Sequence, residues 1–236
     1  MNLTCRDEQL TELMDDPACD PATLRRTLRR FWIVNRAVSR WGLVYRTQLR
    51  PALAAAPGPA RMLDIGCGGG DVLRRLLRLA RRDGFTVEGV GIDPDPRAIE
   101  VARAGARGAN GEGVRFRQSD SRALVAEGER FEVVVSNHLL HHLDGTELDG
   151  VLADSEALAT RLCVHSDIAR DPRAYGAFSV AAAPVAPGTF LRVDGLRSIR
   201  RSYTRDELAA RLPDGWRAEQ PAAFRVLAVR RAGSRG

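Results

Sequence analysis

The stretch that decides the fold is Asp64-Ile65-Gly66-Cys67-Gly68-Gly69-Gly70, a short apolar run that ends in a glycine-rich turn. Glycine permits positive φ angles and lets backbone N–H groups approach a ligand without an intervening Cβ. In a dinucleotide-binding pattern read from Gly66, the sixth place is Asp71, whose carboxylate would face a pyrophosphate. No Gly-Lys-Ser/Thr of a phosphate-binding loop follows either. Asp64 instead suits a ligand that carries an ammonium group.

Beyond this turn, short apolar runs alternate with helical patterns. The predicted strands span residues 62–65, 87–92, 114–118, 131–136, 162–166 and 223–229, and the predicted helices span 71–82, 96–106, 146–159 and 204–212. Strands that alternate with helices of about 10–15 residues are typical of parallel sheets covered on both faces. The sequence therefore predicts an α/β fold with a doubly wound, mostly parallel sheet.

The N-terminal quarter of the chain has a different pattern. Residues 1–20 are polar and predict a loosely held lead-in, and residues 23–49 carry apolar side chains at helical spacing. This one long or broken amphipathic helix is expected to stop near Arg50-Pro51. We expect a lead-in and helix over residues 1–56 and one α/β domain over 57–236. Residues 169–201 interrupt the alternation and predict an insertion that builds substrate walls.

Composition excludes several classes of protein. The length of 236 residues suits one large α/β domain. The formal net charge is +6, but all basic residues are arginine and they form no run of five or more, so no nucleic-acid partner is expected.

Four features of membrane, secreted or metal-binding proteins are also missing from the sequence. No stretch reaches the roughly 18 apolar residues of a spanning helix, and charged residues occupy the N-terminus where a signal peptide is apolar. We expect no integral membrane segment and a cytoplasmic location. The four cysteines lack disulfide-framework or metal-ligand spacing, so no metal site is predicted.

Two further acids follow predicted strands. Asp93, with Pro94 after it, ends the second predicted strand 29 residues after Asp64, and a carboxylate there can accept both hydroxyls of a ribose. Asp120, followed by Ser121, comes after the third strand and is placed to accept from an adenine amino group. Each acid alone could equally be a helix cap or a surface charge. Together with the glycine turn they point to S-adenosylmethionine.

At these residues the chain resembles the class I S-adenosylmethionine-dependent methyltransferases of the ubiquinone-type and small-molecule branch. The resemblance covers residues 60–168 and includes Phe-Glu-Val-Val-Val-Ser-Asn-His-Leu-Leu-His-His-Leu at 131–143. It implies a Rossmann-like sheet of seven strands with an antiparallel last strand, and an N-terminal helix folded as a lid. The residues expected to hold the cofactor are Asp64, Gly66, Cys67, Gly68, Asp93, Pro94, Asp120, Ser121 and Asn137. Tyr45 or Arg46 of the lid could touch the methionine carboxylate, the alternative being plain lid packing.

The histidines indicate how an acceptor could be deprotonated. A phenol or alcohol must lose a proton during methylation, and imidazole has a suitable pKa. All four histidines lie between residues 138 and 165. Small-molecule O-methyltransferases with a Leu-His-His motif are similar, and their first histidine pairs with an aspartate after the fifth strand. The matching residues here are His141 and Asp167. His165 is a second candidate base, and a doublet that only shapes a helix start is the third alternative.

The acceptor is less defined by the sequence. Residues 175–201 are apolar and are expected to line a pocket for a small hydrophobic or phenolic molecule, the alternative being an ordinary cover on the sheet. We therefore predict O-methylation of a small metabolite. C-methylation of a quinol ring, methylation of RNA or protein, and cofactor binding without catalysis remain as alternatives.

Overall fold

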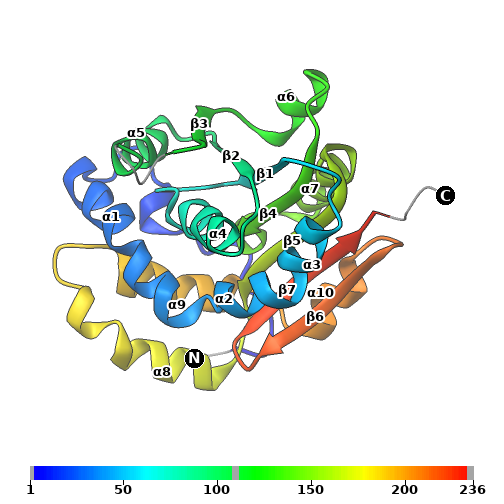
Figure 1. Cartoon of the computed structure of the whole chain (residues 1–236). Coiled ribbons are helices and arrows are strands. Elements are labelled where there is room, and N and C mark those ends of the chain that lie inside the picture. The colour runs from blue at the N-terminus through cyan, green and yellow to red at the C-terminus, as the bar shows by residue number, and fades with distance from the viewer. Residues whose placement is uncertain (1–2, 108–111, 233–236) are drawn as a thin grey trace.

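The computed structural model describes residues 3–107 and 112–232. Seven strands form one sheet in the order β3-β2-β1-β4-β5-β7-β6 (Figure 1). β7 runs antiparallel to both of its neighbours, and the other adjacent strands are parallel. The strands are β1 (Ala60–Ile65), β2 (Val87–Asp93), β3 (Val114–Gln118), β4 (Phe131–Asn137), β5 (Ala159–Ile168), β6 (Trp216–Ala222) and β7 (Arg225–Arg231). The predicted fold class and the antiparallel last strand are confirmed.

Helices cover both faces of the sheet, and each face has its own apolar core. On one face of the sheet, the strand side chains pack against α2, α3, α4 and α5. On the other face, they pack against α6, α7 and α10. These helices are α2 (Trp41–Val44), α3 (Arg50–Ala54), α4 (Asp71–Arg82), α5 (Pro96–Gly105), α6 (Ser121–Ala126), α7 (Gly145–Leu158) and α10 (Arg205–Arg211). Adjacent strand residues such as Val133 and Val134 enter different cores because side chains alternate across a sheet.

Strand β6 and helix α6 are among the elements absent from the prediction. β6 has a polar sequence that contains Pro221, which is compatible with a strand at the edge of the sheet but gives no strong strand signal. α6 is only six residues long, too short for a helical period to be read from the sequence.

The predicted broken helix begins as α1 (Pro21–Val38) and continues through α2, a π-helical turn at Tyr45–Leu49 and α3. The break falls where Arg40 has a φ of 52°, a left-handed conformation that cannot continue a helix. The end expected at Arg50-Pro51 is wrong. Pro51 lies in the first turn of α3, and the helical run continues past it to Ala54.

The expectation of a loose lead-in is also wrong. Residues 3–16 pack along α9 (Leu191–Arg201), from which the Asp194 carboxylate accepts hydrogen bonds from the backbone N–H groups of Leu13 and Met14 at 2.8 and 3.0 Å. The backbone N–H of Asp7 donates to the carbonyl of Arg200 at 3.1 Å. The segment is ordered because its polar groups find partners on a helix that lies far away in the sequence.

The interruption at 169–201 consists of α8 (Pro172–Ala181), a 3-10 turn at Ala183–Val185 and α9. α8 runs along the outside of the molecule and packs on α9 (Figure 1). Of the helices in the described ranges, none combines the length and the apolar character needed to span a bilayer.

Candidate functional site

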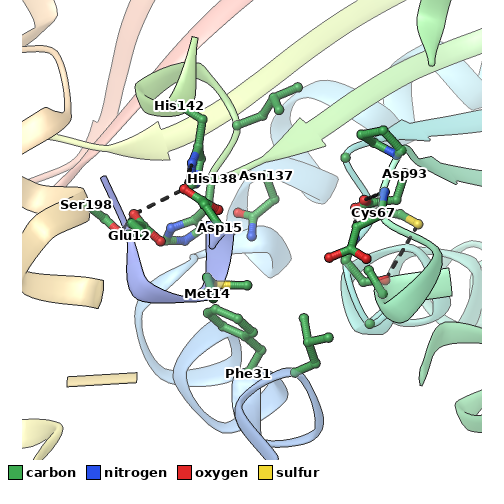
Figure 2. A pocket seen from close by; sticks show the side chains of 18 of the residues that line it. Glu12, Met14, Asp15, Phe31, Cys67, Asp93, Asn137, His138, His142 and Ser198 are labelled. Carbon is green, nitrogen blue, oxygen red and sulfur yellow. Dashed lines mark hydrogen bonds and ion pairs between the residues drawn. The ribbon is translucent and has the colours of Figure 1, made fainter. Parts of the chain in front are cut away.

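A cavity of about 870 Å³ opens at the carboxyl ends of β1, β2 and β4. This is the edge at which open α/β sheets bind ligands. Its walls also include the N-terminal segment, α1 and α9. Figure 2 shows Asp93 and Cys67 at one end of the cavity, Glu12, His142 and Ser198 at the other, and Asn137 between them. We call these the aspartate end and the histidine end.

The glycine turn forms the floor of the aspartate end. Gly66, Gly68 and Gly70 have φ angles of 66°, 51° and 70°, which side chains other than glycine adopt only with strain. A Cβ at Gly70 would also lie 2.4 Å from Phe116 Cζ. The turn is tied to β2 because the Gly68 N–H donates to Asp93 Oδ2 at 3.0 Å. The predicted turn residues Gly66, Cys67 and Gly68 all line the cavity.

Asp64 carries an unpaired buried oxygen. The side chain is 1% exposed, and its Oδ1 has no hydrogen-bond partner among the described residues. Burial raises the pKa of this carboxyl well above its usual range, and the nearby Asp71 and Asp93 carboxylates raise it further. A buried polar atom without a partner is destabilising. A cationic group placed in the cavity would satisfy Asp64 and offset that cost.

Asp93 has both carboxylate oxygens in use, yet each has spare capacity. Oδ2 accepts from Gly68 and Oδ1 accepts from the N–H of Asp95 at 2.9 Å. A carboxylate oxygen has two lone-pair sites, so each oxygen can accept one more hydrogen bond. Burial raises the pKa of Asp93. Asp93 and Pro94 line the cavity, as does Asn137, whose Oδ1 accepts from Trp41 Nε1 at 3.0 Å.

Four residues predicted to hold the cofactor lie away from this cavity. Asp120 caps α6 by accepting from the Ala123 N–H at 2.8 Å, and Ser121 is buried against Asp154. Tyr45 is 2% exposed and donates to Asp83 at 3.1 Å, within the core under α4, and Arg46 is exposed on the surface. None of the four lines the cavity, because cap geometry and the phase of the helix turn the side chains elsewhere. Asp120 and Tyr45 follow the alternatives of a helix cap and plain packing, and a cofactor role for these four residues stays a prediction.

The predicted pair of His141 and Asp167 is present. Asp167 Oδ1 lies 2.8 Å from His141 Nδ1, and Asp167 Oδ2 accepts the backbone N–H of His141 at 2.9 Å. Both side chains are 1% exposed. Burial alone would raise the pKa of Asp167, but the charge and hydrogen bond of His141 hold it well below its usual range. Asp167 therefore fixes the orientation of the imidazole.

The other nitrogen of His141 contacts a residue that the sequence does not suggest. Glu12 Oε1 lies 3.1 Å from His141 Nε2, and Ser198 Oγ donates to the same oxygen at 2.5 Å. Burial opposes the charge on His141, but Asp167 and Glu12 outweigh it and raise the pKa to about 9. Both carboxylates therefore favour the charged form of the imidazole.

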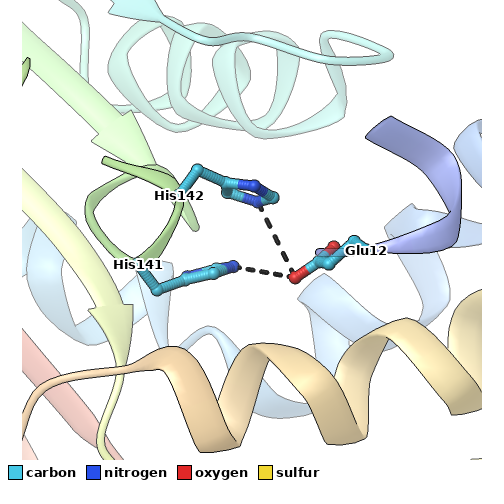
Figure 3. Close-up of side chains that lie close together, drawn as sticks. All are labelled: Glu12, His141 and His142. Atoms are coloured by element: carbon cyan, nitrogen blue, oxygen red, sulfur yellow. Dashed lines mark hydrogen bonds and ion pairs between the residues drawn. The ribbon is translucent and has the colours of Figure 1, made fainter. Parts of the chain in front are cut away.

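His142 completes the histidine end. Its Nδ1 lies 3.1 Å from Asp15 Oδ2, and its Nε2 lies 3.8 Å from Glu12 Oε1 (Figure 3). The loop that carries both histidines is held by Arg201, which donates to the carbonyl oxygens of His141 and His142 at 3.0 Å each.

His165 is excluded from the cavity. Its Nδ1 lies 2.8 Å from Ser136 Oγ and its ring stacks on Trp216, with ring centroids 5.4 Å apart. Burial lowers its pKa to about 4. The candidate base His165 lies two residues before Asp167 on β5, is enclosed by Ser136 and Trp216, and does not line the cavity.

Residues 175–201, expected to form the acceptor walls, contribute little to this cavity. Within that range Ser198 and Arg201 line the cavity, and both are polar. Part of the apolar lining comes from α1 and the N-terminal segment, as Leu24, Leu28, Phe31 and Met14, and part from Val72, Leu139 and Leu143. Glu12 and Asp15, also from that segment, were missed because nothing local distinguishes them from surface acids.

Comparison with known proteins agrees with this geometry. Residues 62–159 match a family described as a methyltransferase domain. A ubiquinone biosynthesis O-methyltransferase of Roseobacter denitrificans is 35% identical over 125 residues, which cover 51% of this chain and 47% of that protein. One from a Methylobacterium species is 37% identical over 125 residues, again 47% of its length. The matches thus span about half the length of these relatives.

Solved structures share the fold. An O-methyltransferase family protein from Burkholderia thailandensis superposes with a TM-score of 0.62 at 17% identity, over 89% of this chain and 60% of that one. The plantazolicin methyltransferase BpumL, solved with S-adenosylhomocysteine, has a TM-score of 0.53 at 13% identity, over 88% of this chain and 95% of its own. The chain is therefore similar to methyltransferases in two respects, the matched domain at residues 62–159 and the fold that it shares with these solved structures.

Proposed function

We propose that this chain transfers a methyl group from S-adenosylmethionine to a hydroxyl of a small hydrophobic or phenolic molecule. The observation that carries the proposal is the aspartate end, where the unpaired oxygen of Asp64 and the spare lone pairs of Asp93 face one cavity beside an open glycine turn. Asp64 suits the ammonium group of the methionine end, and Asp93 suits the two ribose hydroxyls. The ammonium group and the ribose both belong to one molecule, S-adenosylmethionine.

When bound, the cofactor supplies a sulfonium methyl group for an in-line displacement. In such a reaction alignment of the two partners and exclusion of water lower the barrier. The apolar residues Leu24, Leu28 and Phe31 line the cavity and are suited to excluding water from it. The chain itself must then provide a destination for the hydroxyl proton.

We assign that destination to His141 Nε2, with Asp167 as the orienting partner at Nδ1. The geometry adds one requirement, because Glu12 occupies Nε2 in this structure. An acceptor hydroxyl must replace Glu12 at that nitrogen before it can donate a proton there. Loss of the Glu12 contact also removes one of the interactions that keep the imidazole charged, so the same exchange moves His141 toward the neutral form that a base requires.

The acceptor class is supported by two features. The curated relatives are named as O-methyltransferases of ubiquinone biosynthesis. The cavity wall is apolar along α1 and polar at the histidine end, which suits a hydrophobic ring with a hydroxyl at one side. A quinol satisfies the same description, so its hydroxyl and its ring carbon are both possible points of attack.

The test has two stages. Calorimetry should detect binding of both S-adenosylmethionine and S-adenosylhomocysteine, because the groups that Asp64 and Asp93 suit are common to both. A panel of phenols and quinols is then incubated with labelled cofactor, and NMR locates the methyl group on any product. A methyl group on oxygen supports the proposal, and one on carbon replaces it with ring methylation. No heat with either ligand, together with binding of NAD, would overturn the proposal.

A further inference from the structure

Three side chains from two distant parts of the sequence converge on one point at the histidine end (Figure 3). Glu12 Oε1 lies 3.1 Å from His141 Nε2 and 3.8 Å from His142 Nε2, and the three atoms all lie within 4.8 Å of one another. A zinc ion bonded to imidazole and carboxylate at about 2.0–2.2 Å holds its ligand atoms roughly 3–3.5 Å apart. Small side-chain shifts would bring the three atoms to that spacing.

The rear of each imidazole strengthens this interpretation. His141 Nδ1 lies 2.8 Å from Asp167 and His142 Nδ1 lies 3.1 Å from Asp15. Histidines that bind metals usually donate the other ring N–H to a carboxylate, which fixes the ring and leaves the second nitrogen as the ligand. A simple ion pair with Glu12 requires one such imidazole. Here both histidines have this arrangement, and both turn Nε2 toward the same oxygen.

The surroundings are also suited to a cation. Glu12 is 4% exposed, and the carboxylates of Asp15, Asp167 and Asp194 lie nearby. Ser198 orients Glu12 by donating to Oε1, so the ligand atoms are held in place by residues behind them. A buried acidic group is costly unless a cation or a proton is present.

We propose that Glu12, His141 and His142 bind a divalent transition-metal ion of the Zn²⁺ type. Two imidazole nitrogens and one carboxylate form the ligand set of many catalytic zinc sites, which keep a further position open. Since all three residues line the cavity, that position faces it. The cysteine spacing predicts no metal site, but these ligands come together only in the folded chain.

The ion would occupy His141 Nε2, the nitrogen to which the proposed function assigns the hydroxyl proton. Metal binding and proton uptake at this nitrogen therefore exclude each other. This consequence rests on the proposed function, whereas the metal site itself does not.

The experiment uses the full chain without an affinity tag, after treatment with a chelator and dialysis. Co²⁺ is titrated as a spectroscopic probe, and Zn²⁺ is then added in competition. We expect one Co²⁺ per chain with visible absorption, which Zn²⁺ removes. Glu12→Gln and His142→Ala should each weaken Co²⁺ binding by at least about tenfold, because loss of an outer-shell partner alone costs about 10–100-fold. Glu8→Gln, at an exposed acid of the same segment, is the matched control and should bind as wild type.

Two results would overturn the metal site. One is the absence of Co²⁺ absorption with the folded wild-type chain. The other is equal Co²⁺ affinity for three chains, namely wild type, His142→Ala and a third variant, Asp15→Asn. Circular dichroism must show that both variants have a native fold. Binding of S-adenosylhomocysteine, measured separately by calorimetry, reports on the aspartate end. Its failure would count against the proposed function and leave the metal result unaffected.

Discussion

Replacement of Asp93 tests the aspartate end most directly. In the structure each carboxylate oxygen of Asp93 accepts one backbone N–H and retains one free lone-pair site. Two ribose hydroxyls can therefore form two hydrogen bonds to a charged group. Such bonds contribute about 1.5–3 kcal/mol each, and about 1.4 kcal/mol corresponds to a tenfold change in affinity. Asp93→Ala should weaken binding of S-adenosylhomocysteine by more than about tenfold.

A second substitution separates the ribose contacts from the shape of the turn. Asp93→Asn keeps the size of the side chain but has one acceptor oxygen and no charge, so its loss of affinity should lie between those of wild type and Asp93→Ala. Asp206→Asn, at an exposed acid in the first turn of α10, is the control and should not change the affinity.

The assay is isothermal titration calorimetry with S-adenosylhomocysteine, with circular dichroism to show that each variant is folded. We expect Asp93→Ala to have the largest Kd and Asp93→Asn an intermediate one. Wild type and Asp206→Asn should have the same, smallest Kd. A folded Asp93→Ala chain that binds within about twofold of wild type would show that Asp93 does not hold the ribose, and the assignment of the aspartate end would have to be abandoned.

Three further predictions concern the other site residues. Asp64→Asn should weaken binding of S-adenosylhomocysteine at least about tenfold in calorimetry. It should also raise or preserve the melting temperature of the free chain, because it removes a buried carboxylate with an unpaired oxygen. A lower melting temperature would contradict this reasoning. His141→Ala should reduce kcat by a factor of about 10²–10⁴ and leave cofactor affinity nearly unchanged. Asp167→Asn should reduce kcat less. Near-normal turnover of His141→Ala in the labelled-cofactor assay would show that His141 is not the base. Asp120→Ala should lower the free energy of unfolding by about 0.5–2 kcal/mol through loss of a helix cap and leave cofactor affinity unchanged, whereas weaker binding would restore Asp120 to the site.

The parts of the site that could be predicted are those encoded within a few residues. The glycine turn and the acids at the ends of β1 and β2 belong to single strand-turn-helix units, so their spacing in the sequence determines their positions. Asp120 shows the limit of this reasoning. An acid after a strand can face a ligand or cap the next helix, and here its Oδ1 accepts from the Ala123 N–H. The two roles have the same local sequence.

Tyr45 shows a different limit of sequence reasoning. The helical period of residues 23–49 identifies one apolar face but does not say what that face contacts, and a π-helical turn at Tyr45–Leu49 shifts the phase further. Glu12 could not be predicted at all. Its partner Ser198 is 186 residues away, and no periodicity in either segment indicates the contact.

The two ends of the cavity differ in how they are built. The aspartate end consists of strand ends and the glycine turn, all within the matched domain at 62–159. The histidine end takes Glu12 from the N-terminal segment, Asp167 from the end of β5 and Ser198 from α9, which all lie outside that match. Under the proposed function, changes in those outer segments can therefore alter the acceptor without disturbing the strand ends to which the cofactor is assigned. For this reason the matched domain supports the cofactor more strongly than the acceptor, and the acceptor has to be found by experiment at the histidine end.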